Sequence, residues 1–170
     1  IKKDSILIEY SDYGGKFYSI ITLIQLINFY NTNLPLGLIE DRPALNWRGM
    51  HLDCARQFYT IDEIKRLMNY MCFFKLNRFH WHLTDNEAWR VELDCYPNLT
   101  KVGAFRGYDH TIPPFYGTGY NKTGGYYSRS QINELIEYAR QRNIEIMPEI
   151  DLPAHSWTLL QVMPELRDSS

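Results

Sequence analysis

Apolar and polar residues follow two alternating periodicities after residue 44. Three short apolar runs with strand-like alternation span residues 48–53, 76–83 and 144–150. Between them lie two stretches with helical spacing of apolar residues, and Thr60 with Glu63 forms a capping-box pattern at the head of the first. The apolar positions of these two helices are Ile64, Leu67, Met68 and Met71, then Ile132, Leu135, Ile136 and Ala139. The order β-α-β-α-β predicts an α/β fold with a parallel sheet.

A different pattern occupies residues 1–43. Residues 5–10 predict a strand, residues 12–15 a turn, and residues 17–29 a buried amphipathic helix. That helix contains polar residues and is shorter than the roughly 20 residues of a membrane span, so we expect no membrane span. Residues 31–43 contain two prolines and read as a linker. We therefore expect two domains, 1–43 and 44–170.

Composition limits the classes of partner. The 170 residues include 18 basic and 20 acidic side chains, giving a formal charge of −2, and 45% of the residues are apolar. This balance provides no broad positive field for nucleic acid and favours a small neutral partner. Three cysteines without paired spacing predict free thiols, neither a disulfide framework nor a zinc site.

Acids and histidines gather where two predicted strands end. His80-Trp81-His82-Leu83-Thr84-Asp85 closes the second strand, and Pro148-Glu149-Ile150-Asp151 with His155 closes the third. Carboxyl ends of parallel strands meet at one edge of a sheet, so Asp85 and His155 are expected to converge there. A carboxylate fixes the tautomer of a histidine and favours its charged form, which suits proton-transfer chemistry. The alternative is a structural histidine bonded to loop backbone.

Three further charged residues fall at the same edge. Arg56 follows the first strand, and its fork of donors suits sugar hydroxyls or a carboxylate. Glu149 and Asp151 share a strand face and need partners if buried, for which Arg56 is a candidate.

A metal site is the competing interpretation. His80 and His82 are two residues apart and point to one strand face, an arrangement that also begins some metal-dependent barrel hydrolases. Asp85, Asp151 and His155 would complete such a ligand set. Histidines hydrogen-bonded within the sheet are the favoured reading.

The long segment 97–127 hangs from the carboxyl end of the second strand and is rich in Gly, Pro and Tyr. Its length and position favour a function. Its aromatic residues could stack on a sugar ring or simply form a small cluster that closes the rim. They are Tyr108, Phe115, Tyr116 and Tyr120.

At this point the motifs, taken together and in order, resemble the β-N-acetylhexosaminidases of glycoside hydrolase family 20, over residues 44–166. They are Trp47-Arg48-Gly49, Leu52-Asp53-x-x-Arg56, Lys75-Leu76-Asn77, residues 80–85, Trp89-Arg90, Gly124-Gly125-Tyr126-Tyr127 and residues 148–155. The resemblance implies a TIM (β/α)8 barrel with its first three strands present, preceded by the end of a small α+β domain.

The same resemblance implies a reaction. It is the retaining removal of terminal β-linked N-acetylglucosamine or N-acetylgalactosamine, with the substrate's own acetamido group as nucleophile and with no metal or other cofactor. Asp85 and His155 would form the pair that supports the catalytic acid, Arg56 would bind sugar hydroxyls, and Glu149 and Asp151 would line or brace the pocket. The implied partner is an N-acetylhexosamine-terminated oligosaccharide or glycoconjugate. The implied location is secreted, periplasmic or lysosomal, and oligomerisation is possible.

The sequence also departs from the family pattern. The family's catalytic Asp-Glu pair belongs to a His-x-Gly-Gly-Asp-Glu motif on the fourth strand, which residues 1–170 do not contain. We therefore expect these residues alone to be inactive, with a noncatalytic carbohydrate-binding remnant as a further alternative. Asn86-Glu87-Ala88 stands where Asp-Gln-Gly is common, and Ala154 where glycine is usual.

Overall fold

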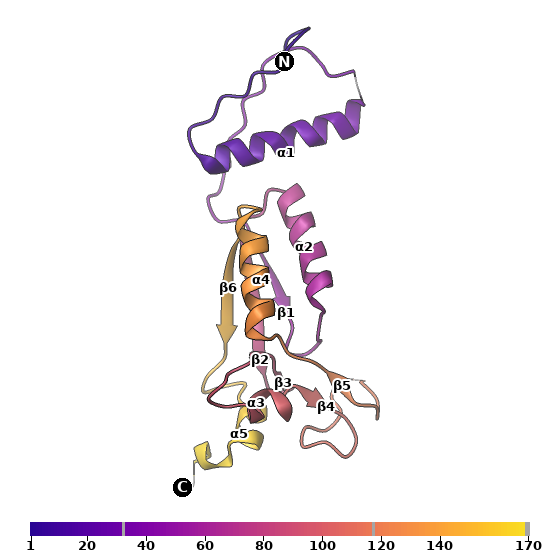
Figure 1. Cartoon of the computed structure of the whole chain (residues 1–170), viewed down its shortest axis with the longest axis vertical. Helices are drawn as coiled ribbons and strands as arrows, with labels where there is room; N and C mark the ends of the chain where they lie inside the picture. The colour runs from indigo at the N-terminus through magenta and orange to yellow at the C-terminus, as the bar shows by residue number, and fades with distance from the viewer. Residues whose placement is uncertain (32, 117, 169–170) are drawn as a thin grey trace.

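The computed structural model describes residues 1–31, 33–116 and 118–168, which form an elongated molecule (Figure 1). The segment with α1 (Tyr13–Tyr30) lies at one end, and the parallel strands run away from it. The short elements that follow the strand ends gather at the other end, beside α5 (Trp157–Val162) and the short 3-10 helix η1 (Pro164–Leu166).

Three parallel strands form the sheet, in the order β1 (Gly49–Asp53), β2 (Arg78–Asp85) and β6 (Glu145–Ile150). The helices α2 (Ile61–Phe73) and α4 (Arg129–Arg140) precede β2 and β6. This confirms the predicted β-α-β-α-β order. One addition was not predicted: the two-residue strand β3 (Ala88–Trp89) folds back antiparallel onto the end of β2.

Side-chain alternation along β2 separates the core from the other face. Phe79 and Trp81 are buried in a core with apolar residues of α2 and α4, whereas His80 and His82 occupy the opposite face. Both helices begin with a capping box, at Thr60 for α2 as predicted and at Ser128 for α4. The buried cluster comprises Cys54, Ile64, Met68, Met71, Phe79, Trp81, Leu83, Tyr127, Leu135, Ala139 and Ile144.

The segment after β3 is more ordered than a plain loop. It contains α3 (Asn98–Lys101) and a hairpin of β4 (Phe105–Arg106) with β5 (Thr123–Gly124). At Gly124 the backbone has φ +128°, and a Cβ would lie 2.1 Å from the carbonyl oxygen of Ala104. Only glycine allows the two strands to approach so closely.

Three predictions for residues 1–43 were wrong. Residues 5–10 form no strand, because no described residue pairs with them in a ladder. The helix begins earlier than predicted, since Asp12 caps it by accepting a hydrogen bond from the Gly15 N–H at 2.6 Å. Its apolar face is not buried: Ile21 is 8% exposed, but Ile20 and Ile24 are 43% and 42% exposed.

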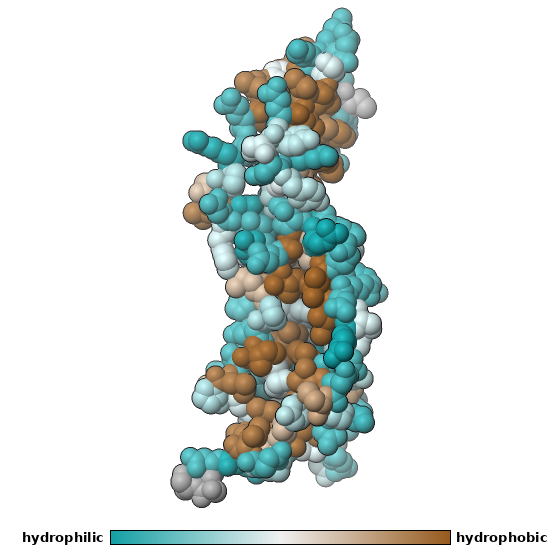
Figure 2. Space-filling model, turned by 60° about the vertical axis from the view of Figure 1, so that its left-hand side comes forward, coloured by the Kyte–Doolittle hydropathy of each residue, from teal (hydrophilic) through white to brown (hydrophobic). Residues whose placement is uncertain are grey.

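Hydrophobic residues accordingly reach the surface around the α1 end and along the column below it, as Figure 2 shows for one face. No helix within the described ranges is long and apolar enough to cross a membrane.

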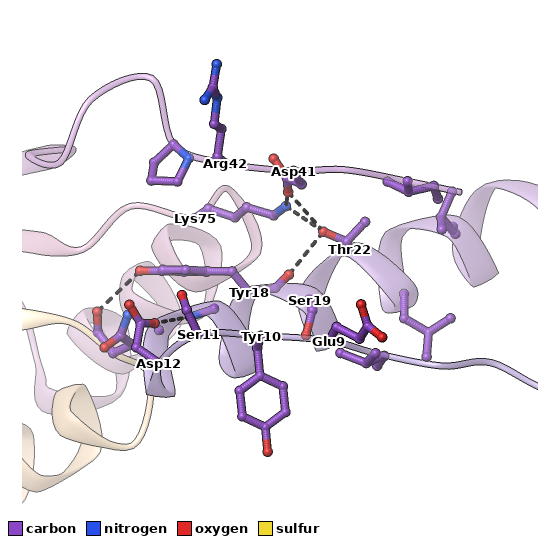
Figure 3. Close-up of a pocket in the computed structure, with 18 of the residues that line it drawn as sticks. Glu9, Tyr10, Ser11, Asp12, Tyr18, Ser19, Thr22, Asp41, Arg42 and Lys75 are labelled. Atoms are coloured by element: carbon purple, nitrogen blue, oxygen red, sulfur yellow. Dashed lines mark hydrogen bonds and ion pairs between the residues drawn. The ribbon is translucent and has the colours of Figure 1, made fainter. Parts of the chain in front are cut away.

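A cavity of about 780 Å³ lies between residues 1–43 and the amino ends of β1 and β2. In Figure 3, Lys75 reaches across it to Asp41 and to Thr22. The hydrogen bond from Lys75 lowers the pKa of Asp41. It outweighs the opposing effect of burial, so this pKa lies below its usual value. This cavity is at the opposite end of the sheet from Asp85, so it belongs to the junction between the two predicted domains.

Candidate functional site

Asp85, the last residue of β2, is the centre of the site at the carboxyl edge of the sheet. Its side chain is 1% exposed and accepts from four directions. Oδ1 accepts from the Asn86 N–H at 2.6 Å and faces His155 Nδ1 at 3.1 Å. Oδ2 faces Arg56 Nη2 at 2.6 Å and His82 Nε2 at 3.0 Å. The predicted convergence of Asp85 with His155 is therefore present.

Arg56 lies in the middle of three carboxylates. Its Nη1 donates to Asp53 Oδ2 at 2.8 Å, its Nη2 contacts Asp85, and its Nε donates to Glu87 Oε2 at 3.0 Å. Three of its five N–H groups are thus engaged with carboxylates, and of the other two the one on Nη1 has a long contact with His82 Nε2 at 3.5 Å. The side chain is 34% exposed, so the remaining donors can reach a ligand.

The turn that carries Arg56 is fixed by Asp53. The Oδ1 atom of Asp53 accepts from the backbone N–H groups of Ala55 and Arg56, both at 3.0 Å. Burial raises the pKa of Asp53, but the hydrogen bonds and charge of Arg56 outweigh burial and hold that pKa below its usual value. Asp53 therefore stays ionised and orients the guanidinium.

The buried side chain of Arg90 donates hydrogen bonds to the turn that carries Arg56. Arg90 is 1% exposed and donates only to carbonyl oxygens within the described chain, without a carboxylate partner. Burial, followed by the charge of Arg106, lowers its pKa to about 10. Because its acceptors lie in both segments, Arg90 connects the turn of Arg56 to the β4–β5 hairpin. The acceptors are Cys54 O (2.8 Å), Ala55 O (2.9 Å), Ala104 O (2.6 Å) and Gly125 O (2.8 Å).

The loop after β6 brings Asp151 and His155 to the same edge. The Asp151 N–H donates to Thr84 Oγ1 at 3.1 Å, which joins this loop to the end of β2. His155 has φ +54°, in the left-handed region, and its side chain is 50% exposed. Its ring thus contacts buried Asp85 on one side and remains accessible on the other.

Nearer the amino ends of the strands than Asp85, three histidines and Glu149 share the face of the sheet that α2 and α4 do not cover. Glu149 Oε2 lies 2.7 Å from His80 Nε2, 2.8 Å from His82 Nδ1 and 3.8 Å from His51 Nε2. The strand register explains this, because His82 pairs directly with Glu149 across β2 and β6. The expectation that Arg56 would pair with Glu149 or Asp151 was wrong, since its three carboxylate partners are Asp53, Asp85 and Glu87.

His82 is held between two carboxylates. Its side chain is 5% exposed, with Nε2 toward Asp85 and Nδ1 toward Glu149. Burial lowers the pKa of His82, but the contacts with Glu149 and Asp85 outweigh it and raise the pKa above 6.5. Burial raises the pKa of Glu149, and the nearby histidines outweigh it and lower the pKa. Both groups therefore favour their charged forms.

The metal-site alternative fits this geometry poorly. Two groups of possible ligands exist, His51 with His80 and Glu149, and His82 with Asp85 and Asp151. Nitrogens and oxygens around a tetrahedral zinc ion are about 3.3 Å apart. The contacts of Glu149 with His80 and His82 are shorter, 2.7 and 2.8 Å, so these side chains pair with each other directly.

Tyr108, Phe115 and Tyr120, three of the four aromatic residues singled out in segment 97–127, lie in two aromatic pairs. Tyr108 and Tyr120 form an edge-to-face pair at 5.6 Å, and Phe115 packs against Trp157 at 5.7 Å. The Trp157 N–H donates to Asn86 Oδ1 at 3.0 Å, so the second pair is anchored beside Asp85. Stacking on a sugar remains a prediction for both pairs.

Sequence reasoning missed two residues of this site. The side chain of Glu87 is 4% exposed and pairs with Arg56, and its position two residues after Asp85 was the available signal. Arg90 was noted only as part of a motif, because its four acceptors come from distant segments.

Chemically, the site combines a fixed carboxylate, an accessible histidine and a guanidinium with spare donors at one edge. Such a set can bind hydroxyl groups and support proton transfer at a neighbouring acid.

Comparison with known proteins finds similar sequences over most of the chain. Residues 45–170 match the family model described as glycosyl hydrolase family 20, catalytic domain. A β-hexosaminidase of Vibrio furnissii is 42% identical over 167 residues, which cover 97% of this chain and 27% of that protein. The N,N'-diacetylchitobiase of Vibrio harveyi is 40% identical over 164 residues, which cover 92% of this chain and 19% of that protein.

A solved structure is similar as well. The crystal structure of a family 20 exo-β-N-acetylglucosaminidase from Vibrio harveyi, in complex with N-acetylglucosamine, superposes with a TM-score of 0.87 at 40% identity. The match covers 98% of this chain and 27% of that one. The chain therefore spans less than a third of the length of these relatives.

Proposed function

The chain belongs to glycosyl hydrolase family 20, and from this membership we propose that it contributes part of the active site of an exo-acting β-N-acetylhexosaminidase. The catalytic domain of this family is a TIM barrel, and β1, β2 and β6 supply three strands of its wall. The substrate class is a glycan or glycoconjugate ending in β-linked N-acetylglucosamine or N-acetylgalactosamine. The reaction is a retaining hydrolysis in which the substrate's acetamido oxygen attacks the anomeric carbon.

One observation carries the proposal: the 1% exposed carboxylate of Asp85 contacts both Arg56 and His155 at the carboxyl edge of the sheet. Active sites of barrels lie at this edge. A neutral sugar needs hydroxyl-binding donors and a proton-transfer system in one place, and these three residues supply parts of both.

Each residue has a proposed role. Arg56 uses its two remaining N–H groups to bind sugar hydroxyls, while Asp53, Asp85 and Glu87 fix its orientation. Asp85 orients His155 and favours the charged imidazole, which supports the neighbouring acid. Asp151 lines the pocket beside them.

The proposal also includes the domain division at residues 43 and 44. Two observations support this division: the cavity at the amino end of the sheet, and the family match that begins at residue 45.

The acid that protonates the leaving group is not assigned within residues 1–170. The one Asp-Glu doublet in the sequence is Asp62-Glu63, in the first turn of α2. Glu63 accepts from the Thr60 N–H at 2.7 Å as part of the capping box, so this doublet is a helix cap. We therefore propose that residues 1–170 by themselves do not hydrolyse the substrate.

The test is hydrolysis of a chromogenic N-acetyl-β-glucosaminide by the longest natural form of the protein that contains this chain. Turnover with the β-anomer as first product, followed by proton NMR, is the expected result. The same assay on residues 1–170 should give no turnover above buffer. Inversion at the anomeric carbon, or turnover by residues 1–170 alone, would contradict the proposal.

A further inference from the structure

We propose that His82 and Glu149 are positioning residues of this site: Glu149 holds His82 as an imidazolium, and His82 sets how strongly Asp85 acts on His155. The inference rests on the proposed function for its catalytic meaning. Its ionisation step rests on the contacts around His82 and needs no assigned function.

The His82 ring lies between two carboxylates. Nε2 is 3.0 Å from Asp85 Oδ2, and Nδ1 is 2.8 Å from Glu149 Oε2. A neutral imidazole carries one N–H, so one of its nitrogens would present a lone pair to a carboxylate oxygen. The imidazolium has an N–H on both nitrogens and avoids this repulsion.

The contact between His82 and Glu149 depends on charge. Among the described residues, His82 Nδ1 and Glu149 Oε2 are both buried atoms without an aligned hydrogen bond. At 2.8 Å the two atoms nevertheless touch, so the contact is an ion pair whose strength depends on charge. Neutralising Glu149 therefore removes the main stabiliser of the charge on Nδ1.

Other charged or titratable groups also surround His82. From β1, Asp53 favours the charged ring, and His51 lies with its ring centroid 5.8 Å away. Arg56 Nη1 is 3.5 Å from His82 Nε2 and opposes the charge. His80 shares the same oxygen of Glu149. Carboxylates thus face His82 from all three parallel strands, which outweighs the single guanidinium.

The consequence reaches His155 through Asp85. The Asp85 carboxylate is balanced by Arg56 and by charged His82 on one oxygen, and it contacts His155 through the other. If His82 becomes neutral, Asp85 is less balanced and holds a charged His155 more strongly. Glu149 thereby adjusts a histidine that it does not contact.

The test is nitrogen-15 NMR of the histidine side chains during a pH titration, with the longest natural protein that contains this chain. Glu149→Gln should lower the titration midpoint of His82 by about one pH unit, since one adjacent charge is worth about that much. It should also raise the midpoint of His155. His51→Gln is the matched control, because it removes an imidazole facing Glu149 without touching Asp85, and it should leave the His82 midpoint in place.

The kinetic arm uses the pH profile of kcat/KM. A raised pKa means that the contribution of His82 is present below that pKa and is lost as pH rises through it. Glu149→Gln lowers the pKa of His82, so Asp85 loses this balancing charge at lower pH and holds charged His155 more strongly. Because charged His155 is the supporting form, the alkaline limb of kcat/KM should move to higher pH. Glu149→Asp, which keeps the charge, should restore the limb and serves if the glutamine variant folds poorly.

The outcomes are separable. A neutral His82 in the unmodified protein at pH 6, or a His82 midpoint unchanged in Glu149→Gln, would overturn the imidazolium. A His155 midpoint that stays fixed while His82 shifts would overturn the positioning role. Absence of turnover by the unmodified protein would count against the proposed function only, because the NMR arm needs no substrate.

Discussion

Replacing Arg56 with alanine should affect both substrate and stability, and the structure allows each to be estimated. The guanidinium contacts three carboxylates, of which Asp85 and Glu87 have side chains only 1% and 4% exposed. Without Arg56, these two acids lose their shared cation. The two N–H groups proposed to bind sugar hydroxyls are lost at the same time.

For the substrate, a hydrogen bond to a charged group contributes about 1.5–3 kcal/mol, so two bonds contribute about 3–6 kcal/mol. This corresponds to a fall in kcat/KM of about 10² to 10⁴-fold. For stability, breaking a buried ion pair costs about 3–5 kcal/mol, and the 34% exposure of Arg56 reduces this to about 2–3 kcal/mol.

The assay pairs kcat/KM for a chromogenic N-acetylglucosaminide with the urea unfolding midpoint, both on the longest natural protein. Arg56→Lys is the matched variant, because it keeps the charge but not the fork of donors. Lysine should recover most of the stability and little of kcat/KM. A folded alanine variant with kcat/KM within threefold of the unmodified protein would refute the hydroxyl-binding role.

Three other predictions concern neighbouring residues. Asp85→Asn should lower kcat about 100-fold and move the alkaline limb of the pH–rate profile to lower pH, since the amide no longer favours charged His155; an unmoved limb would make the pair merely structural. Arg90→Met should lower the free energy of unfolding by about 3–5 kcal/mol because four carbonyl groups, three of them in buried hydrogen bonds, lose their donor. Arg140→Met on the exposed face of α4 should change it by less than about 0.5 kcal/mol, and equal urea midpoints would contradict this. Asp53 has a lowered pKa, so its stabilisation is present above its ordinary value of 3.8 and is lost as pH falls further, and Asp53→Asn should flatten the decline of the urea midpoint between pH 4 and pH 2.

The elements of the sheet were predictable because two periodicities differ so clearly. Phe79 and Trp81 alternate with histidines along β2, whereas Ile64, Met68 and Met71 recur at helical spacing in α2. The pairing of Asp85 with His155 also followed from sequence, because parallel strand ends must meet at one edge. Each of these inferences needs only local spacing and the direction of the chain.

Partner choice among the charged residues was not predictable in the same way. Glu149 was expected near Arg56, but the register aligns it with His82. Arg56 instead finds acids on its own turn and just beyond β2. The apolar pattern of α1 likewise could not show what packs against it, and Ile20 and Ile24 remain exposed. Register and packing are set by the whole fold, which spacing along one segment does not encode.

The carbonyl contacts of Arg90 have a consequence for engineering. Any chimera that imports residues 97–127 from a relative also imports the acceptors Ala104 and Gly125, while the turn before Arg56 stays with the host. If the imported hairpin is shifted relative to the host's Arg90, the turn that carries Arg56 would move. The graft would then disturb sugar recognition without altering any residue that is proposed to bind the sugar. Donor segments should therefore be exchanged together with their own versions of residues 53–56 and 88–90.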